Sequence, residues 1–484
     1  MNSPANTIPL CVDLDGTLIL TDSLLESLVR LLKTQPWKLF ILPFWLLGGR
    51  AAMKRKIAQL VTLDASSLPY RHELVSFLKE EEKKGRTLVL ATAADEKIAR
   101  GVANHLGFFK KLIASDGKNN LKGKQKAAAL VQLYGPRGFD YVGNSPADIP
   151  VWAEAQQALA VGVSPGQLRR AGRLVPVEPM FGPTKFSWSD VAKIFRVHHW
   201  VKNILIFSPL MLSHQVQNLT AWSQSGVTFL AFSLTASAVY IINDLLDLDA
   251  DRSHASKKDR PFASGQAPLA LGMVAAPVLL LIALAIGSTV QPQVDLLLIV
   301  YLCLNLAYSL VLKRVLFLDV LLLASFYVLR IFIGSVATDI PISPWFMAFS
   351  LFLFLSLALV KRISELIELK EEDTPSTGRS YLPGDKELLL NFGTTSGYLS
   401  VLVLALYVNG SDVQSLYQYP NILWGICPVL LYWLSRLWLL TRRGEVTSDP
   451  IVFAFTDKTS YLTALLAVAI WCAAWGLLPI PFFE

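Results

Sequence analysis

Long apolar stretches alternate with short polar loops throughout residues 200–480. About nine of these stretches approach the ~20 residues that a helix needs to cross the core of a bilayer. The predicted spans are residues 201–219, 223–243, 267–289, 293–312, 316–337, 344–364, 388–408, 421–440 and 459–479. The first is the weakest, because Pro209, His214 and Gln215 interrupt it, and it is expected to be partly interfacial. The pattern predicts an all-α bundle of about nine transmembrane helices.

The charges of the loops support this arrangement. Alternate loops, at residues 213–222, 288–293, 338–344 and 409–420, contain neither Lys nor Arg. The loops between them contain Arg252, Lys257, Lys258, Arg260, Lys313, Arg314, Lys361, Arg362, Lys370, Arg436, Arg442 and Arg443. Because basic loops remain in the cytoplasm, we expect a multi-pass protein of the inner (cytoplasmic) membrane with its N-terminal domain and active sites on the cytoplasmic side. The alternative, buried helices of a large soluble protein, does not explain this alternation.

The first 190 residues follow a different pattern, in which short apolar strands alternate with polar helical stretches, as in a soluble α/β domain. The chain is therefore expected to be multidomain. Its predicted parts are an α/β domain at residues 1–165 with a small helical cap at about 20–80, a Pro- and Gly-containing linker at 166–190, and a transmembrane domain at 191–484.

The predicted cap contains a second apolar feature, the run WKLFILPFWLL at residues 37–47, which is followed by Lys54, Arg55 and Lys56. The run is too short to cross a bilayer. An apolar helix beside basic residues is typical of an interfacial helix on an anionic leaflet. Packing of the cap on its own core is the equal alternative.

The strand at residues 8–12 ends in Asp13-Leu14-Asp15-Gly16-Thr17, which resembles the first motif of the haloacid dehalogenase-like phosphatases. The resemblance implies a Rossmann-like fold in which Asp13 attacks phosphorus and Asp15 is the general acid and base. It further implies that Thr92, after a strand at 86–91, holds the phosphoryl group and that Lys126 neutralises it. The implied Mg²⁺ ligands are Asp13, Asp15, Asn144 and Asp148.

One of these positions departs from the family. The pattern there is Gly-Asp-x-x-x-Asp, and this chain has Asn144 in place of the first aspartate. The amide removes a negative charge, and ligand charge is one determinant of cation affinity. Mg²⁺ is therefore expected to bind more weakly, and a degenerate or regulatory head is the alternative to a working phosphatase.

A second acidic cluster follows the apolar run 228–242, where Asn243, Asp244, Asp247 and Asp251 lie at a membrane boundary. Carboxylates are costly near hydrocarbon and usually have a functional reason there. Their spacing places three of them on one face of a helix. Mg²⁺ is commonly held by one or two carboxylates together with substrate phosphates, so we predict a site for a Mg²⁺-bound diphosphate.

Polar residues at the same predicted membrane face complete a candidate substrate site. These candidates are Lys202, Asn243, Lys258, Arg260, Tyr308, Lys313, Lys361 and Arg362. Basic side chains beside metal-binding acids suit a diphosphate and other phosphate groups. Spacing alone does not separate this interpretation from ordinary basic residues that flank membrane spans.

The motif Asn243-Asp244-x-x-Asp247-x-x-x-Asp251 resembles the first aspartate motif of the UbiA-type intramembrane prenyltransferases. Together with KKDRPFASG at 257–265, YSLVLKR at 308–314 and KRISEL at 361–366, it resembles the polyprenyl-phosphate phosphoribosyltransferase branch. That branch implies Mg²⁺-dependent transfer of 5-phosphoribose from phosphoribosyl pyrophosphate to a polyprenyl phosphate. The usual second aspartate motif is replaced by Glu365, Glu368, Glu371, Glu372 and Asp373.

The two resemblances together predict a bifunctional enzyme whose phosphatase domain removes the ribose 5-phosphate. The alternatives are an aromatic prenyltransferase with an inactive head and, in another class, a transporter or flippase. The net charge of +7 is explained by the membrane loops rather than by nucleic acid, and an oligomer is possible. The four cysteines form no CxxC pair, which argues against a disulfide framework or a zinc site.

Overall fold

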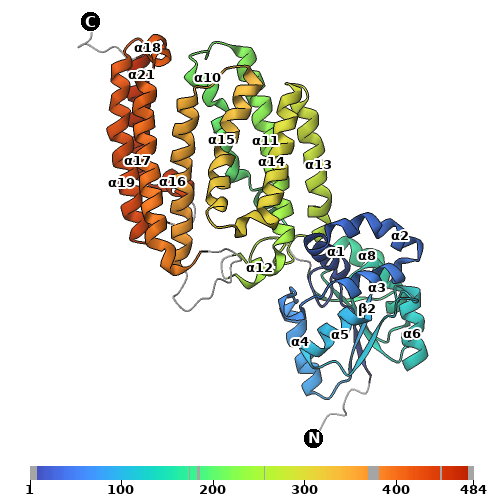
Figure 1. Ribbon diagram of the computed structural model, residues 1–484. Helices are drawn as coiled ribbons and strands as arrows, with labels where there is room; N and C mark the ends of the chain where they lie inside the picture. Colours follow the sequence, from blue (N-terminus) through green and yellow to red (C-terminus); the bar gives the residue numbers. More distant parts are fainter. Residues whose placement is uncertain are drawn as a thin grey trace. The chain divides into compact units, whose positions relative to one another are not determined.

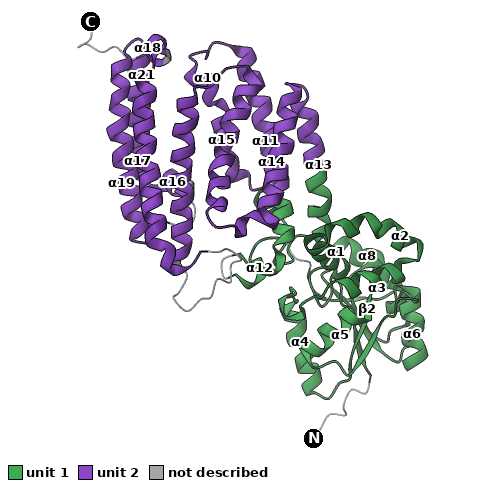
Figure 2. Ribbon diagram, viewed as in Figure 1, with its two compact units in different colours: residues 1–195, 240–277 green, residues 196–239, 278–484 purple. Residues whose placement is uncertain are grey.

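The computed structural model describes residues 8–173, 175–182, 186–254, 257–368, 381–446 and 450–477 (Figure 1). The chain divides into two compact units (Figure 2). The first combines Met1–Phe195 with Tyr240–Pro277, and the second combines Arg196–Val239 with Val278–Glu484. The aspartate motif therefore belongs to the same unit as the N-terminal α/β fold.

A parallel sheet with strand order β3-β2-β1-β4-β5-β6 forms the centre of the first unit. Its strands are β1 (Leu10–Val12), β2 (Leu88–Asp95), β3 (Lys111–Ser115), β4 (Asp140–Gly143), β5 (Ala158–Val161) and β6 (Glu178–Phe181). Successive side chains of a strand point to opposite faces. Accordingly, Leu10 and Val12 belong to one buried cluster and Cys11 to another. The order reverses on the two sides of β1, where open α/β sheets bind ligands beyond the carboxyl ends of their strands.

Helices connect the strands and cover the sheet. They are α4 (His72–Lys83), α5 (Glu96–Leu106), α6 (Lys124–Tyr134), η3 (Pro146–Asp148), α7 (Ile149–Glu154) and α8 (Pro165–Gly172), and α9 (Trp188–Phe195) follows the last strand. Strand β6 pairs with β5 inside the stretch that the sequence predicted as a linker. The sheet therefore continues beyond residue 165.

The cap lies between β1 and β2 in the sequence. It contains α1 (Ser23–Thr34), η1 (Pro36–Ile41), α2 (Leu42–Leu47), α3 (Arg50–Leu60) and η2 (Ala65–Ser67). A small core of Leu31, Ile57 and Val61 holds these helices together. The exposed apolar residues of η1 and α2 include Trp37, Phe40, Phe44 and Leu47, which are 62%, 82%, 69% and 86% exposed. The structure thus has both a cap core and an apolar surface on the cap.

Eight helices of the described chain are long and apolar enough to cross a membrane. They are α11 (Leu219–Leu246), α13 (Leu269–Gly287), α14 (Pro292–Leu310), α15 (Leu318–Thr338), α16 (Pro344–Glu368), α17 (Lys386–Val408), α19 (Ile426–Arg442) and α21 (Lys458–Trp475). The shorter elements are η5 (Leu312–Arg314), η6 (Pro383–Asp385), α18 (Ser411–Leu416), η7 (Pro420–Gly425) and α20 (Pro450–Thr456). These eight helices match eight of the predicted spans.

The first predicted span, residues 201–219, differs from the prediction of a long α-helix. Its place is taken by the 3₁₀ segment η4 (Val197–Phe207) and the short helix α10 (Ser208–Leu212). Polar side chains turn this segment toward α11, because Trp200 donates to Ser237 at 3.0 Å and Asn203 donates to Ser233 at 2.9 Å. Hydropathy predicted one long helix here, but it takes no account of these side-chain hydrogen bonds or of Pro209, which disfavours a continuous α-helix.

Candidate active sites

Asp13 lies directly beyond β1, at the switch point of the sheet. Lys126, on α6, places its Nζ 2.8 Å from Asp13 Oδ1 and donates to the Tyr141 hydroxyl at 2.7 Å. Tyr141 in turn donates to Asp148 Oδ1 at 2.9 Å. The structure therefore brings together three residues predicted from sequence and adds Tyr141, a residue that the sequence analysis did not single out.

The second carboxylate of the motif, Asp15, lies at the start of the cap. Its Oδ1 accepts a hydrogen bond from the Ser23 backbone N–H at 2.8 Å. Gly16 between the strand and the cap has φ +72°, and a Cβ there would lie 2.1 Å from Asn144 Nδ2. Glycine is required at this position because the amide of Asn144 approaches the backbone so closely.

Thr92 is buried within β2, not beyond its end, because the strand continues to Asp95. The predicted strand end at residue 91 is therefore too early. The Thr92 hydroxyl accepts a hydrogen bond from the Ala94 N–H at 3.0 Å. Lys54 of the cap reaches the same place and donates to Ala93 O at 2.7 Å and to Asn120 Oδ1 at 3.4 Å. Sequence reading had grouped Lys54 with a basic membrane-facing cluster.

Burial controls the protonation of these groups. It raises the pKa of Asp13 to about 6, against the lowering effect of the Lys126 charge. It raises the pKa of Asp15 to about 7, and the charge of Asp22 adds to the rise. Burial lowers the pKa of Lys126, but Asp13 and Asp148 outweigh it and the net change is upward. Asp15 is thus suited to exchange a proton near neutral pH.

The residues around Asp13 suit a divalent cation only in part. Asp13 and Asp15 are carboxylates whose charged forms are disfavoured by burial, and a cation would relieve this cost. Asp148 is already engaged, because its Oδ2 accepts from the backbone N–H groups of Asn144 and Ser145 and from the Ser145 hydroxyl, each at 3.1 Å. Mg²⁺ would be held by the Asp13 carboxylate, the backbone carbonyl of Asp15 and the Asn144 amide oxygen, which leaves the Asp15 carboxyl free to carry a proton, while Asp148 holds the loop.

The aspartate motif does not lie on one continuous helix, contrary to the sequence prediction. Helix α11 ends at Leu246, Asp247 is the N-cap of α12 (Leu248–Ser253), and Asp251 lies within that short helix. Backbone bonds from Asp247 N to Asn243 O at 2.9 Å and from Asp251 N to Asp247 O at 2.8 Å still link the segments.

Arg260 joins the first and last of these aspartates. Its Nη1 lies 3.0 Å from Asp244 Oδ1 and 2.6 Å from Asp251 Oδ2. One cationic nitrogen therefore bridges two carboxylates, which is the arrangement that a bound metal ion would need. Burial raises the pKa of Asp251, while Arg260 opposes the rise. The pair fits Mg²⁺ if Arg260 moves to the substrate phosphates.

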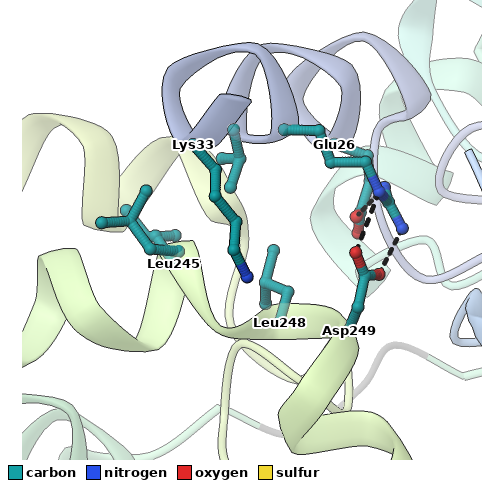
Figure 3. A pocket seen from close by; sticks show the side chains of 8 residues that line it. Glu26, Lys33, Leu245, Leu248 and Asp249 are labelled. Carbon is teal, nitrogen blue, oxygen red and sulfur yellow. Dashed lines mark hydrogen bonds and ion pairs between the residues drawn. The ribbon is translucent and has the colours of Figure 1, made fainter. Parts of the chain in front are cut away.

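Asp247 faces the cap. Lys33 of α1 places its Nζ 3.7 Å from Asp247 Oδ1. Figure 3 shows Lys33 extending from α1 toward the α12 segment beside a pocket. The pocket is lined by Glu26, Val29, Arg30, Lys33, Leu245, Leu246, Leu248 and Asp249.

No group of three or more His, Cys, Asp or Glu side chains that could hold a metal occurs among the described residues.

The second unit contains a separate buried charge cluster. Arg362 Nη2 lies 2.9 Å from Asp319 Oδ2, and its Nη1 contacts Glu365. The hydroxyl of Tyr381 donates to Asp319 Oδ1 at 2.5 Å. Arg362 is 1% exposed. In this structure its guanidinium is engaged by carboxylates of the chain, and its contact with substrate stays a prediction.

The other predicted substrate residues are distributed over both units. Asn243 and the exposed Lys258 belong to the first unit. Half-buried residues of the second unit are Lys202, Tyr308, Lys313 and Lys361. Lys202 lies 6.0 Å from the centre of the Tyr327 ring, and Tyr308 packs edge-on against Phe326. Glu371, Glu372 and Asp373 lie outside the described residues, as does the side chain of Glu368.

The two parts of the chain match two different families of known proteins. Residues 205–457 match the UbiA prenyltransferase family. The chain belongs to the UbiA prenyltransferase family. Residues 10–152 of this UbiA protein match the haloacid dehalogenase-like hydrolases. Both resemblances seen in the sequence and the predicted fold class are thereby confirmed: an α/β domain precedes a helical membrane domain.

Two relatives of this UbiA protein cover different lengths of it. Uncharacterized protein y4nM of Sinorhizobium fredii is 40% identical over 471 residues, 96% of this chain and 90% of the relative. Decaprenyl-phosphate phosphoribosyltransferase of Mycobacterium tuberculosis is 36% identical over 286 residues, 58% of this chain and 92% of the relative. A solved UbiA homologue from Archaeoglobus fulgidus bound to GPP and Mg²⁺ is 16% identical, with a TM-score of 0.46, and covers 58% of this chain and 99% of that one.

Proposed function

We propose that this UbiA protein transfers the 5-phosphoribosyl group of phosphoribosyl pyrophosphate to a polyprenyl phosphate at the cytoplasmic face of the inner membrane. The N-terminal domain would then remove the 5-phosphate and give polyprenylphosphoryl ribose. The observation that carries the proposal is the pair Asp244 and Asp251, which converge on Arg260 in a chain 36% identical to a decaprenyl-phosphate phosphoribosyltransferase over 286 residues.

The proposed transfer is a substitution at C1 of ribose. An anionic oxygen of the lipid phosphate forms a bond to C1, and the bond between C1 and the diphosphate oxygen breaks with its electron pair leaving on diphosphate. The product is a phosphodiester that keeps the ribose 5-phosphate. Because negative charge grows on the leaving diphosphate, fixed positive charge near it lowers the barrier.

The residues divide into two sets for this step. Asp244, Asp247 and Asp251 would hold Mg²⁺, which when bound supplies positive charge to the diphosphate. Arg260 and Lys258 are proposed to bind its oxygens, and the Asn243 carbonyl supports the motif through the Asp247 N–H. Lys202, Tyr308, Lys313, Lys361 and Arg362 remain proposed contacts for the sugar 5-phosphate and the lipid phosphate.

The proposed phosphatase step uses the site at β1. Asp13 attacks phosphorus and forms an aspartyl-phosphate, while Asp15 gives a proton to the departing ribose oxygen. Water then attacks the phosphorus of the aspartyl-phosphate while Asp15 takes its proton, and the bond between phosphorus and the Asp13 oxygen breaks, which releases inorganic phosphate and regenerates the Asp13 carboxylate. Lys126, 2.8 Å from Asp13, favours the ionised nucleophile. Mg²⁺ held by the Asp13 carboxylate, the Asp15 backbone carbonyl and the Asn144 amide oxygen would supply positive charge to the phosphoryl oxygens, with Thr92 beside them and Asp148 orienting the loop.

Both steps are tested with full-length protein in detergent, Mg²⁺, polyprenyl phosphate and phosphoribosyl pyrophosphate labelled in the ribose. Asp244→Asn with Asp251→Asn is expected to lower lipid-linked label about 100-fold or more. Asp13→Asn is expected to accumulate a lipid-linked ribose 5-phosphate, seen by mass spectrometry, without release of phosphate.

Other outcomes decide against the proposal. Phosphate release by Asp13→Asn at the wild-type rate excludes the phosphatase step. Absence of ribosylated lipid, together with product from a prenyl diphosphate and 4-hydroxybenzoate, supports an aromatic prenyltransferase with an inactive head.

A further inference from the structure

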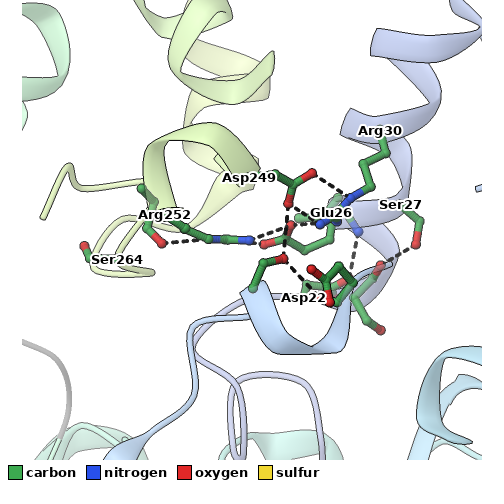
Figure 4. A network of polar contacts seen from close by, with 12 residues as sticks. Asp22, Glu26, Ser27, Arg30, Asp249, Arg252 and Ser264 are labelled. Atoms are coloured by element: carbon green, nitrogen blue, oxygen red, sulfur yellow. Dashed lines mark hydrogen bonds and ion pairs between the residues drawn. The ribbon is translucent and has the colours of Figure 1, made fainter. Parts of the chain in front are cut away.

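Helix α1 of the phosphatase-like cap makes a buried ionic contact with the aspartate segment, which we define as residues 243–254. Glu26 is fully buried, and its Oε1 and Oε2 lie 2.6 Å and 3.2 Å from Nη2 and Nη1 of Arg252 (Figure 4). The side chain of Arg252 is 7% exposed. A two-pronged bond between a carboxylate and a guanidinium fixes orientation as well as distance.

A second pair lies one turn further along α1. Arg30 Nε donates to Asp249 Oδ2 at 3.0 Å, its Nη2 contacts Asp249 Oδ1, and its Nη1 lies 3.3 Å from Glu26 Oε2. Ser67 of the cap also donates to Asp249 Oδ1, at 3.3 Å. Asp249 and Arg252 are three apart on α12 and so share one face. The cap therefore binds α12 through that face, while Asp251 of the same helix forms an ion pair with Arg260.

The loop that follows Arg260 makes a third contact with the cap, at Gly265. Arg252 Nε donates to Ala263 O at 2.8 Å, which ties α12 to the loop that follows Arg260. In that loop Gly265 has φ +75°, and a Cβ there would lie 2.6 Å from Leu20 Cβ. The cap thus contacts the chain on both sides of Arg260, at α12 before it and at Gly265 after it.

The other end of α1 begins at the phosphatase-like site. Its first residue, Ser23, donates its backbone N–H to Asp15 Oδ1 at 2.8 Å, and the Asp22 side chain caps the helix by accepting from the N–H groups of Leu24 and Leu25. Glu26 follows within one turn, because its N–H bonds to Asp22 O at 3.0 Å. One short helix therefore contacts both acidic sites of the first unit.

We propose that Glu26 and Arg30 are positioning residues for the membrane transferase, and that through Arg252 and Asp249 the phosphatase-like head sets the geometry of the Asp244–Asp251 pair. The head is then required for correct binding of the Mg²⁺-diphosphate substrate, in addition to any hydrolysis it performs. The inference rests on the proposed function only for the identity of that substrate.

The first test measures hydrogen exchange of residues 247–254 in full-length protein. Glu26→Gln and Arg252→Met are expected to exchange at least tenfold faster there than wild type. Glu81→Gln is the matched control, because Glu81 is a buried head carboxylate that pairs with Arg86 at 2.9 Å. It should change exchange of residues 247–254 less than twofold. Wild-type exchange in Glu26→Gln, or equal acceleration in Glu81→Gln, overturns the proposal.

The second test separates positioning from simple loss of folded protein. Glu26→Gln is expected to raise the KM for phosphoribosyl pyrophosphate about tenfold, with excess Mg²⁺ restoring part of the loss, while Arg252→Lys has an intermediate KM. A lower kcat with an unchanged KM indicates only a smaller folded fraction and overturns the proposal. If wild type forms no ribosylated lipid, the proposed function fails, and the exchange measurement still decides this inference.

Discussion

At the residue scale, a basic side chain of the protein stabilises the carboxylates in each candidate site. Lys126 lies 2.8 Å from Asp13, and Arg260 lies within 3.0 Å of both Asp244 and Asp251. A buried carboxylate without such a partner is costly. Each site thus has its carboxylates paired with a cation of the chain, and in the proposed function Arg260 would leave Asp244 and Asp251 for the substrate phosphates.

The raised pKa of Asp15 makes folding dependent on pH. The pKa is about 7 in the folded chain and 3.8 in the reference state, so the folded state binds an extra proton between these values. This contribution to stability is fully present below pH 3.8 and is lost as the pH rises through 7. Asp15→Asn is expected to stabilise the α/β fold by about 1–3 kcal/mol at pH 8 and by much less at pH 4.

Urea unfolding with EDTA present, followed by hydrogen exchange of β1 and β4, measures this difference. Asp116→Asn is the control, because hydrogen bonds from the Asn119 and Lys118 N–H groups lower the pKa of Asp116. It is not expected to stabilise the fold at pH 8. An equal effect of Asp15→Asn at both pH values contradicts the assignment.

Lys54 offers a second test at this scale. Its ammonium group contacts Ala93 O beside Thr92, and burial lowers its pKa. Lys54→Met should lower kcat/KM for a small phosphomonoester about tenfold, because a fixed cation near the phosphoryl group is lost. Lys56→Met, which changes an exposed lysine of the same helix, should stay within twofold. Equal kcat/KM values for the two variants would show that Lys54 does not contribute to the phosphatase-like site.

At the element scale, the exposed apolar face of η1 and α2 is the feature that a soluble domain would not explain. Trp37, Phe40, Phe44 and Leu47 are exposed on helices too short to cross a bilayer. The same unit includes the cytoplasmic ends of α11 and α13 in the proposed orientation. We therefore expect η1 and α2 to lie in the headgroup region of the inner leaflet.

A nitroxide at Phe44→Cys, in a cysteine-free chain reconstituted into anionic nanodiscs, tests this location. Oxygen should relax the label more than a soluble nickel complex does, because oxygen concentrates in the bilayer. Leu133→Cys is the control, since Leu133 is 46% exposed on α6 and is expected to face water. The same nickel accessibility at both labels would place the cap helices in solution.

The helices also show which elements the sequence could predict. Eight predicted spans were found, because a run of about twenty apolar residues leaves few alternatives. The segment η4 was not predicted, because the hydrogen bonds from Trp200 and Asn203 to α11 depend on tertiary packing. The break at Asp247 was missed for a similar reason: carboxylate spacing alone does not reveal where a helix ends.

At the scale of the whole molecule, the units do not follow the order of the chain. Sequence reasoning placed the domain boundary near residue 190, whereas residues 240–277 group with the N-terminal fold. Two contacts between residues 219 and 226 positions apart join these segments: Arg30 bonds to Asp249, and Glu26 bonds to Arg252. Local motifs identified Asp13, Asp15 and Asp244, but no local signal distinguishes Glu26 from an ordinary acid in the first turn of a helix.

The close approach of Gly265 to Leu20 and Pro69 limits how such a protein can be assembled from parts. A chimera that received its head from an unrelated phosphatase would bring new side chains against this glycine and leave Arg252 without its carboxylate. Successful exchange of the head would therefore require the loop around Gly265 to be transplanted with it, as one cassette.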